Sequence, residues 1–327
     1  MGEEKGERLM LDEELRQSPF PITWDNTMRA GGHQCKRKLY WFLRGYDYKG
    51  KPSYFTWGSA FQEILVYWYS NPHPPDPEDK QFWEMAYLAL DKGKELYDRE
   101  IGDIEPNRDN SRDNLERIFT NYIQTYPSEA WEVIPGGAEV GWIWPIMGTD
   151  YEMGGSLDGR IHWDSYGALV LENKTTSEYL SDGFISRWHF SGQVTGYIWY
   201  LKQLLGDSEV YGCLMNLITK KVPGPKSSWT TQRVVRDVVK KSKAQLSEFV
   251  ESFLWDVEAV KRCWTSWIWP MTADPTNCTG GAGKAPCLFR NVCLQHQPFT
   301  KVDPLQFQGI QLRSGKWAPW EREGDQD

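Results

Sequence analysis

The spacing of apolar residues along the chain changes near residue 138. Before it, apolar residues three and four positions apart predict helices over residues 57–70, 81–97 and 111–126, because that spacing gathers them on one helical face. After it, Val140, Trp142 and Trp144 alternate with other residues, which is the period of a half-buried strand. Helical spacing returns over 187–205, a strand is predicted over 209–219, and a long helix over 230–262.

Two further strands are predicted to form a hairpin around a polar turn. In the first, small or apolar residues alternate with polar ones, namely Leu157, Gly159 and Ile161 with Asp158, Arg160 and His162. Residues 164–167 are turn formers, and 168–171 form a short apolar run typical of a buried strand. If the turn centres on Ser165, antiparallel pairing sets Asp158 opposite Glu172, with side chains about 5 Å apart. Lys174 then shares the face of Glu172, because residues two apart in a strand point the same way.

This arrangement favours a cation site. Two carboxylates so close repel each other unless a proton or a cation lies between them. A divalent cation with oxygen ligands relieves that repulsion, and a neighbouring lysine suits a phosphate group or an attacking water. The alternative is a surface hairpin whose acids and lysine form ion pairs that contribute little to stability.

Composition indicates an ordinary soluble protein. Hydrophobic residues make up 40% of the 327 residues and charged residues 25%, and no apolar run approaches the length of a membrane span. Residues 1–20 are predicted to be a mobile acidic leader without a secretory signal, so a cytoplasmic location is expected, in a host cell if the gene is viral. A net charge of −8 counts against a general nucleic-acid binder but not against a nuclease, which needs only a local basic surface. The 18 tryptophans fill a core or stack on bases or sugars.

The six cysteines are unevenly placed. Cys35 stands early, and three follow late in the chain, at Cys278, Cys287 and Cys293. Four thiolates favour an iron–sulfur cluster or zinc, whereas a disulfide is disfavoured in a reducing cytoplasm, and unliganded thiols are the remaining alternative. The other two, Cys213 and Cys263, are expected to be packed thiols.

Together these motifs resemble a known family. Asp158 followed by Glu172-Asn173-Lys174 resembles the metal site of the PD-(D/E)XK nuclease superfamily. With Gln193-Val194-Thr195-Gly196-Tyr197 on the next helix, it is similar to the RecB-like exonuclease branch. One early and three late cysteines resemble the [4Fe–4S] cluster of the AddB-like and CRISPR-associated exonucleases, although the interval between Cys278 and Cys287 is longer than usual in that family.

The resemblance implies an α/β fold with a restriction-endonuclease-like core. That core has the order αβββαβ, with a central mixed sheet flanked by helices, an N-terminal helical elaboration and a C-terminal Cys-rich segment. We expect one nuclease domain over residues 21–300 and a tail over 301–327. Within the domain, the expected parts are helices over 57–126, the catalytic core over 138–219, the long helix over 230–262 and the cysteine segment over 278–293.

The resemblance also implies residue roles. Asp158, Glu172 and the carbonyl of Asn173 would hold one or two Mg²⁺ or Mn²⁺ ions, and Lys174 would orient the attacking water. Gln193 and Tyr197 would position the DNA strand. Cys35, Cys278, Cys287 and Cys293 would hold the [4Fe–4S] cluster, with zinc as the rival. Three further positions are less defined: Gln62 stands where the family often has a histidine ligand, Glu63 is its charged neighbour, and Glu139 matches a common glutamate.

The expected function is therefore a metal-dependent DNA exonuclease acting on single strands or duplex ends. A partner in recombination, repair or CRISPR adaptation is expected, and no membrane partner. One alternative is a DNA- or partner-binding protein whose site has decayed, since Gln62 replaces a histidine. Another is a carbohydrate-active protein, because glycosidases also pair two carboxylates about 5–9.5 Å apart.

Overall fold

The chain divides into two compact units, each built from segments distant in sequence. In this computed structural model, residues 16–50, 52–102, 105–222, 233–280, 286–315 and 317–321 are described. The first unit comprises Met1–Gly50, Ile143–Gly155 and Glu248–Asp327, and the second comprises Lys51–Trp142 and Ser156–Ser247. The single domain expected over residues 21–300 stays a prediction, and most of the expected leader, residues 1–15, lies outside the described residues.

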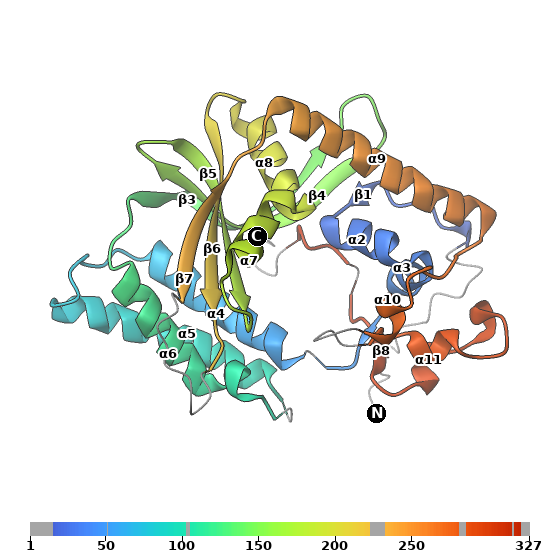
Figure 1. Cartoon of the computed structure of the whole chain (residues 1–327), viewed down its shortest axis with the longest axis horizontal. Coiled ribbons are helices and arrows are strands. Elements are labelled where there is room, and N and C mark those ends of the chain that lie inside the picture. Colours follow the sequence, from blue (N-terminus) through green and yellow to red (C-terminus); the bar gives the residue numbers. More distant parts are fainter. Residues whose placement is uncertain are drawn as a thin grey trace, which may run out of the picture. The chain divides into compact units, whose positions relative to one another are not determined.

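A mixed sheet forms the centre of the second unit (Figure 1). β4 pairs antiparallel with β5, β5 pairs parallel with β6, and β6 pairs antiparallel with β7, while β3 pairs with β4. The strands are β3 (Trp131–Pro145), β4 (Glu152–Trp163), β5 (Gly167–Thr176), β6 (Val210–Thr219) and β7 (Val234–Val239). Helix α8 (Gly192–Leu205) connects the parallel pair and contacts both of its strands. The predicted α/β class, with a mixed sheet flanked by helices in the order αβββαβ, is confirmed.

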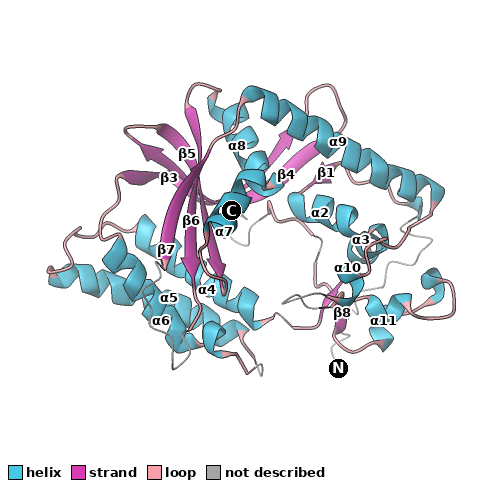
Figure 2. Ribbon diagram, in the orientation of Figure 1, coloured by secondary structure: helices cyan, strands magenta, loops and turns pink. Residues whose placement is uncertain are grey.

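Three helices make a layer that packs on β6 and β7 (Figure 2). They are α4 (Ser53–Ser70), α5 (Lys80–Glu100) and α6 (Arg112–Thr125), which confirm the three helices predicted before residue 138. Their buried cluster includes Ile218 of β6 and Val234 of β7. The ring of Trp57 stacks on Phe61 in α4 with centroids 5.1 Å apart. Gly93 of α5 is required by close approach, because a Cβ there would collide with Ile64.

The predicted long helix over 230–262 is wrong in its first part. Residues 234–239 form strand β7, and the helix, α9, runs from Lys243 to Ser266; residues 230–232 lie outside the described part. The valines over 234–239 recur four residues apart, which suits a helical face. They are also β-branched, and pairing with β6 buries both Val234 and Val239, so the sheet decides the conformation.

Two predicted boundaries also differ from the structure. The first strand begins at Trp131, so Glu139 lies inside β3 rather than at its start, with a left-handed φ of 48°. The helix predicted over 187–205 divides at Ser191: Arg187–Phe190 is a short 3₁₀ helix (η2), and the Ser191 hydroxyl then caps α8 by accepting from Val194 N at 3.3 Å. A short helix, α7 (Asp182–Ser186), precedes η2.

The first unit is made of short elements around aromatic side chains. Strand β1 pairs parallel with the first residues of β4, and β2 pairs antiparallel with β8. Its elements are β1 (Thr23–Trp24), α2 (Asn26–Gln34), α3 (Lys36–Leu43), β2 (Tyr46–Tyr48), most of α9, α10 (Thr276–Thr279), α11 (Arg290–Cys293) and β8 (Ile310–Leu312). The sequence had not predicted α2 or α3. Among the described residues no helix has the length and apolar character to cross a membrane.

Candidate functional site

The β4–β5 hairpin brings the two predicted acids to adjoining strands. Its register pairs Gly159 with Leu171 and continues to Trp163 and Gly167, as a turn centred on Ser165 requires. One further step along this register would set Asp158 opposite Glu172, which is the pairing that the sequence predicts. The two strands are tied at this level, because Asp158 Oδ2 accepts a 2.7 Å hydrogen bond from the backbone N–H of Asn173.

Glu172 and Lys174 form a buried ion pair on β5. Lys174 Nζ contacts Glu172 Oε1, and their side chains are 26% and 2% exposed. Burial raises the pKa of Glu172, against the opposing charge of Lys174. For Lys174 burial would lower the pKa, but the charges of Glu172 and Asp158 outweigh it, so the pKa is raised and the amine stays protonated at neutral pH.

The second carboxylate oxygen of Glu172 is an exception to normal pairing. Glu172 Oε2 is buried and has no hydrogen-bond partner among the described residues. A buried charged oxygen without a partner is costly, and such atoms commonly mark a bound ion or water. Glu172 therefore has one oxygen held by Lys174 and one available to a cation.

Helix α8 covers this face of the sheet. Gln193 and Tyr197 lie one helical turn apart, and Gln193 Nε2 donates to Tyr197 Oη at 2.7 Å. The pKa of Tyr197 lies well above its usual value, first because the ring is buried and second because the charge of Glu172 is near. The hydroxyl of Tyr197 therefore keeps its proton at neutral pH. Trp188 of η2 also lies near Lys174, with its ring centroid 5.7 Å from Nζ.

Cys213 is a neighbour of the site that the sequence did not indicate. It pairs with Val170 in the β5–β6 register and is fully buried. Burial raises the pKa of its thiol well above the usual value, and the charges of Glu172 and Asp158 raise it further. Only the strand register, which the sequence does not specify, could have placed this thiol next to the acids.

Gln62 lies on the opposite face of β5 from Glu172 and Lys174. The side chain of Asn173 points there because alternate strand residues face opposite ways, and its Nδ2 donates to Gln62 Oε1 at 3.1 Å. Asn173 Oδ1 in turn accepts from Asn216 Nδ2 at 2.8 Å. The carbonyl of Gln62, which would have to coordinate a metal, is thus already used by Asn173. Glu63, its neighbour on α4, is half-buried.

Other polar residues of the predicted hairpin do not join the acids. His162 is exposed near the turn, and its Nε2 lies 3.7 Å from Asp164 Oδ1. Arg160 donates to the carbonyl of Gly136 in β3 at 3.0 Å. Of the polar residues on this face of β4, Asp158 therefore lies at the site, whereas Arg160 and His162 have partners outside it.

The donor set fits one kind of metal. Within the described part of the chain, no group of three or more His, Cys, Asp or Glu side chains is placed to hold a metal ion. Asp158 and Glu172 alone supply two carboxylates, to which the main-chain carbonyl of Asn173 can add a third oxygen. Mg²⁺ is commonly bound by one or two carboxylates while it keeps several waters, so these residues suit it better than a fully protein-enclosed ion.

The four predicted cluster cysteines lie near one another in the first unit. The backbone N–H of Cys287 donates to the carbonyl of Cys278 at 3.0 Å. Burial is the main cause of the raised pKa of the Cys287 thiol, and the charges of Cys35 and Cys278 add to it. Burial likewise raises the pKa of Cys293 to about 11, opposed by Arg37 and increased by Cys35 and Cys287. A cationic group bound beside Cys287 and Cys293 would favour the thiolate forms of these two side chains.

Comparison with known proteins gives distant structural likenesses, among them two solved structures. No protein-family model and no curated protein sequence matches the chain. The crystal structure of SSO0001 is 15% identical with a TM-score of 0.26, covering 62% of this chain and 85% of that one. A phage-related exonuclease from Haemophilus somnus 129PT is 11% identical with a TM-score of 0.27, covering 64% of this chain and 93% of its own. At these TM-scores neither likeness carries an argument about function.

Proposed function

We propose that this chain is a metal-dependent DNA nuclease whose site is formed by Asp158, Glu172 and Lys174. The observation that carries the proposal is the buried, unpaired Oε2 of Glu172, on the same face as Lys174 and on the strand next to Asp158. Most buried carboxylate oxygens in proteins are hydrogen-bonded. Here one oxygen is left for a cation, beside an amine that stays protonated.

Each residue has a chemical role in phosphodiester hydrolysis. Asp158, Glu172 and the carbonyl of Asn173 would hold Mg²⁺ or Mn²⁺, which polarises the phosphate and acidifies bound water. Lys174 would orient the attacking water and stabilise the charge that develops on the phosphate oxygens. Tyr197, protonated and bonded to Gln193, would donate a hydrogen bond to the substrate strand.

The finer proposal is an exonuclease of the RecB-like type with a structural iron–sulfur cluster. It is supported by the mutual proximity of Cys35, Cys278, Cys287 and Cys293, which are all free thiols.

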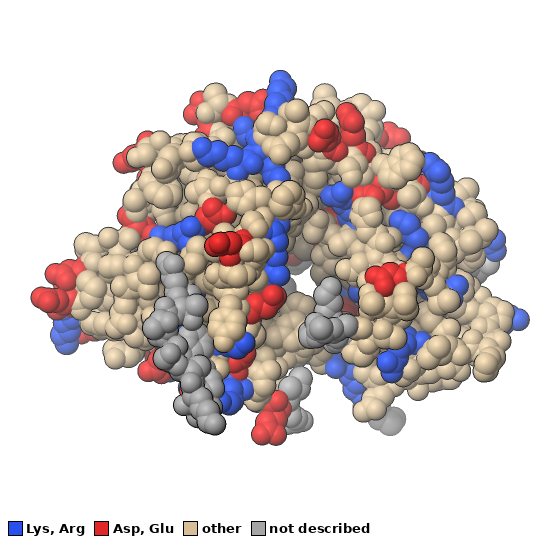
Figure 3. Space-filling view, viewed as in Figure 1, with Lys and Arg blue, Asp and Glu red and all other residues tan. Residues whose placement is uncertain are grey.

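DNA is the proposed substrate, bound through local basic groups. The net charge is −8, and Figure 3 shows lysine and arginine interspersed with aspartate and glutamate. Affinity for phosphates must then come from particular side chains such as Lys174.

The test is cleavage of end-labelled single- and double-stranded DNA with Mg²⁺ or Mn²⁺. Lys174→Ala should abolish cleavage while circular dichroism shows an intact fold. Lys80→Ala is the matched control, because Lys80 is 89% exposed and pairs with Glu84 on its own helix. Full activity of Lys174→Ala would remove this site from the mechanism.

A DNA-binding protein without cleavage activity is the second candidate. This candidate is favoured because the carbonyl of Gln62 already accepts a hydrogen bond from Asn173 and is not left for a metal ion. Two carboxylates then remain as the acidic ligands. Binding of DNA by the wild type without cleavage in either metal would establish this alternative.

A further inference from the structure

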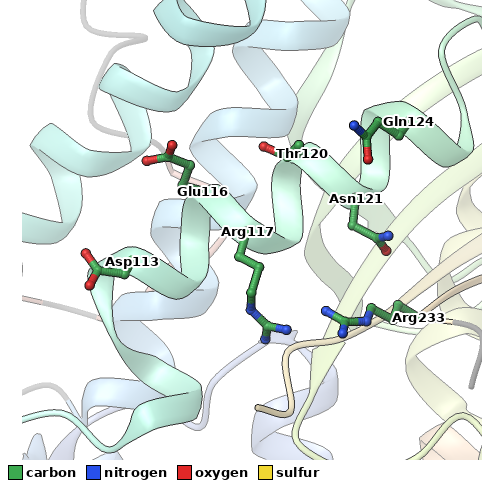
Figure 4. A pocket seen from close by; sticks show the side chains of 7 residues that line it. All are labelled: Asp113, Glu116, Arg117, Thr120, Asn121, Gln124 and Arg233. Atoms are coloured by element: carbon green, nitrogen blue, oxygen red, sulfur yellow. The ribbon is translucent and has the colours of Figure 1, made fainter. Parts of the chain in front are cut away.

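A shallow groove of about 610 Å³ runs beside helix α6 in the second unit. Figure 4 shows that Arg117 of α6 and Arg233, which directly precedes β7, both extend into the same space. The amide of Asn121 lies at the same end. Asp113 and Glu116 line the groove farther toward the start of the helix, and Glu116 is engaged by Lys94 at 2.8 Å. One end of the groove is therefore basic.

Arg117 is held in place by its neighbours. Its Nε donates to Asn114 Oδ1 at 2.9 Å, Nη2 contacts the same oxygen, and Nη2 also donates to the carbonyl of Lys221 at 3.4 Å. Arg233 is fixed through its backbone, because its carbonyl accepts from Thr219 N at 2.9 Å. The guanidinium of Arg117 is thus positioned by Asn114 and Lys221, whereas for Arg233 the β6–β7 pair holds the backbone from which the side chain extends.

Placing these two cations together has an electrostatic cost. Burial lowers the pKa of both Arg117 and Arg233. The charge of Arg233 lowers the pKa of Arg117 further, and the charge of Asp109 opposes that shift. Both groups nonetheless remain charged, as arginine does in proteins. An anion between them would relieve the repulsion, and the planar fork of each guanidinium matches phosphate oxygens.

The groove is linked to the strand that carries the proposed catalytic site. The backbone N–H of Lys220 donates to the carbonyl of Thr176 at 2.8 Å, and Thr176 lies two residues beyond Lys174 on β5. Lys221 follows, with its Nζ 4.2 Å from the ring centroid of Tyr179 and its carbonyl on Arg117. Lys221, just beyond the end of β6, thus adjoins both the end of β5 and Arg117.

We propose that Arg117 and Arg233 together bind one backbone phosphate of a nucleic acid strand, at a site separate from Asp158 and Glu172. Asn121 adds a polar side chain at the same end. The choice of a nucleic acid strand rests on the proposed function, whereas the phosphate site itself rests on the two arginines. Its role is to hold the strand beyond the cleavage point.

The first arm of the test measures DNA binding by the full chain in EDTA. Fluorescence anisotropy with a labelled single-stranded oligonucleotide should show several-fold weaker binding for Arg117→Gln and for Arg233→Gln. For the double variant, the slope of log K against log salt should fall by about 0.7, the value for one phosphate of a single strand. Arg112→Gln, on the same helix and paired with Asp98 at 2.9 Å, is the control and should bind like the wild type.

The second arm replaces DNA by inorganic phosphate. Thermal unfolding should show that phosphate stabilises the wild type more than chloride at equal ionic strength, and that the double variant loses this difference. Arg233→Lys keeps the charge without the fork and should retain part of the effect. Equal melting temperatures of all variants in chloride would show that each one folds.

The outcomes separate the two proposals. Loss of both effects in the double variant supports a backbone phosphate site. Protection by inorganic phosphate without any change in DNA binding overturns the assignment to nucleic acid, and absence of both effects overturns the site. If the wild type neither binds nor cleaves DNA but is protected by phosphate through these arginines, the proposed nuclease function fails while the phosphate site stands.

Discussion

The backbone N–H of Asn173 donates a 2.7 Å hydrogen bond to Asp158 Oδ2, so an acid of β4 is held by the main chain of β5. The position of Asp158 is therefore set by strand register rather than by a flexible loop. A group whose position is fixed in advance needs no reordering when it binds a cation.

Asp158→Asn should keep the fold and lose activity. The amide can still accept from Asn173, but it has no charge to offer a divalent cation. We expect DNA cleavage to fall at least about 100-fold. Removing a residue that only supports a metal ligand already costs up to about 100-fold, and Asp158 is proposed as a ligand itself. Asp164→Asn is the matched control, because Asp164 lies in the turn of the same hairpin with a fully exposed side chain. Equal losses in the two variants would contradict a special role for Asp158.

The buried pair of Glu172 and Lys174 predicts a non-additive effect on stability. Lys174→Met leaves a carboxylate that is 2% exposed without its partner, which should lower the free energy of unfolding by about 3 kcal/mol. In the double variant Glu172→Gln/Lys174→Met no charge remains to be paired, so the loss should be smaller. Urea unfolding in EDTA measures both values. A double variant less stable than Lys174→Met would show that the pair is not coupled in this way.

Lys220 predicts a pH dependence of stability. It is 4% exposed, donates to Asn110 Oδ1 at 2.5 Å, and burial lowers its pKa from 10.5 to about 8. Between these two pKa values the unfolded chain binds more protons than the folded one, so the free energy of unfolding rises with pH in that range. Below about pH 8 Lys220 is charged in both states, so the cost of burying its charge is constant.

The stability of the wild type minus that of Lys220→Met should therefore rise by about 2–3 kcal/mol between these two pKa values. Chemical denaturation at a series of pH values measures this difference. Lys92→Met, at an exposed position, should leave the pH dependence of the wild type unchanged. A flat difference for Lys220→Met would show that the folded protein holds Lys220 at its ordinary pKa.

Tyr122 should matter more than its neighbour Tyr126. The hydroxyl of Tyr122 is buried and accepts from Asn216 Nδ2 at 2.9 Å and from Arg236 Nη2 at 2.7 Å, and it also contacts Tyr69. Tyr122→Phe removes one buried acceptor from each donor and should cost about 2 kcal/mol of unfolding free energy. Tyr126→Phe keeps the ring, whose centroid lies 3.6 Å from the guanidinium carbon of Arg236. This change should alter the free energy of unfolding by less than about 0.5 kcal/mol. Thermal or urea unfolding of the two variants checks the contrast.

The cysteine set predicts a metal content. Anaerobically purified protein should contain iron and absorb visible light, and Cys287→Ser should lose both together with part of its stability, since metal binding stabilises the folded state. Cys263→Ser is the control, because Cys263 lies on α9 outside the set. Protein that contains zinc and is colourless would replace the cluster by a four-cysteine zinc site.

The sequence predicted the parts of the fold in which local pattern and tertiary environment agree. In β4, Leu157 and Ile161 are fully buried while Asp158 is partly exposed and His162 exposed, as strict alternation requires. The hairpin register followed because a one-residue slip would turn every apolar side chain toward the wrong face.

The remainder depended on contacts that are distant in sequence. Val234 and Val239 fit a helical stripe, and only pairing with β6 makes them a strand. Cys213 reaches the acids through the parallel β5–β6 register, which is created by the crossover helix α8. Gln62 was aligned to a ligand position by motif spacing, but the face on which it meets Asn173 depends on how α4 packs.

Because β5 is hydrogen-bonded to β4 on one side and β6 on the other, its amides should be among the slowest in the chain to exchange with deuterium. Edge strand β7 and the outer turns of α4–α6 can open and close while residues 172–174 keep their geometry. Local opening of these outer elements therefore does not displace residues 172–174, the segment whose displacement would be most damaging to the proposed site.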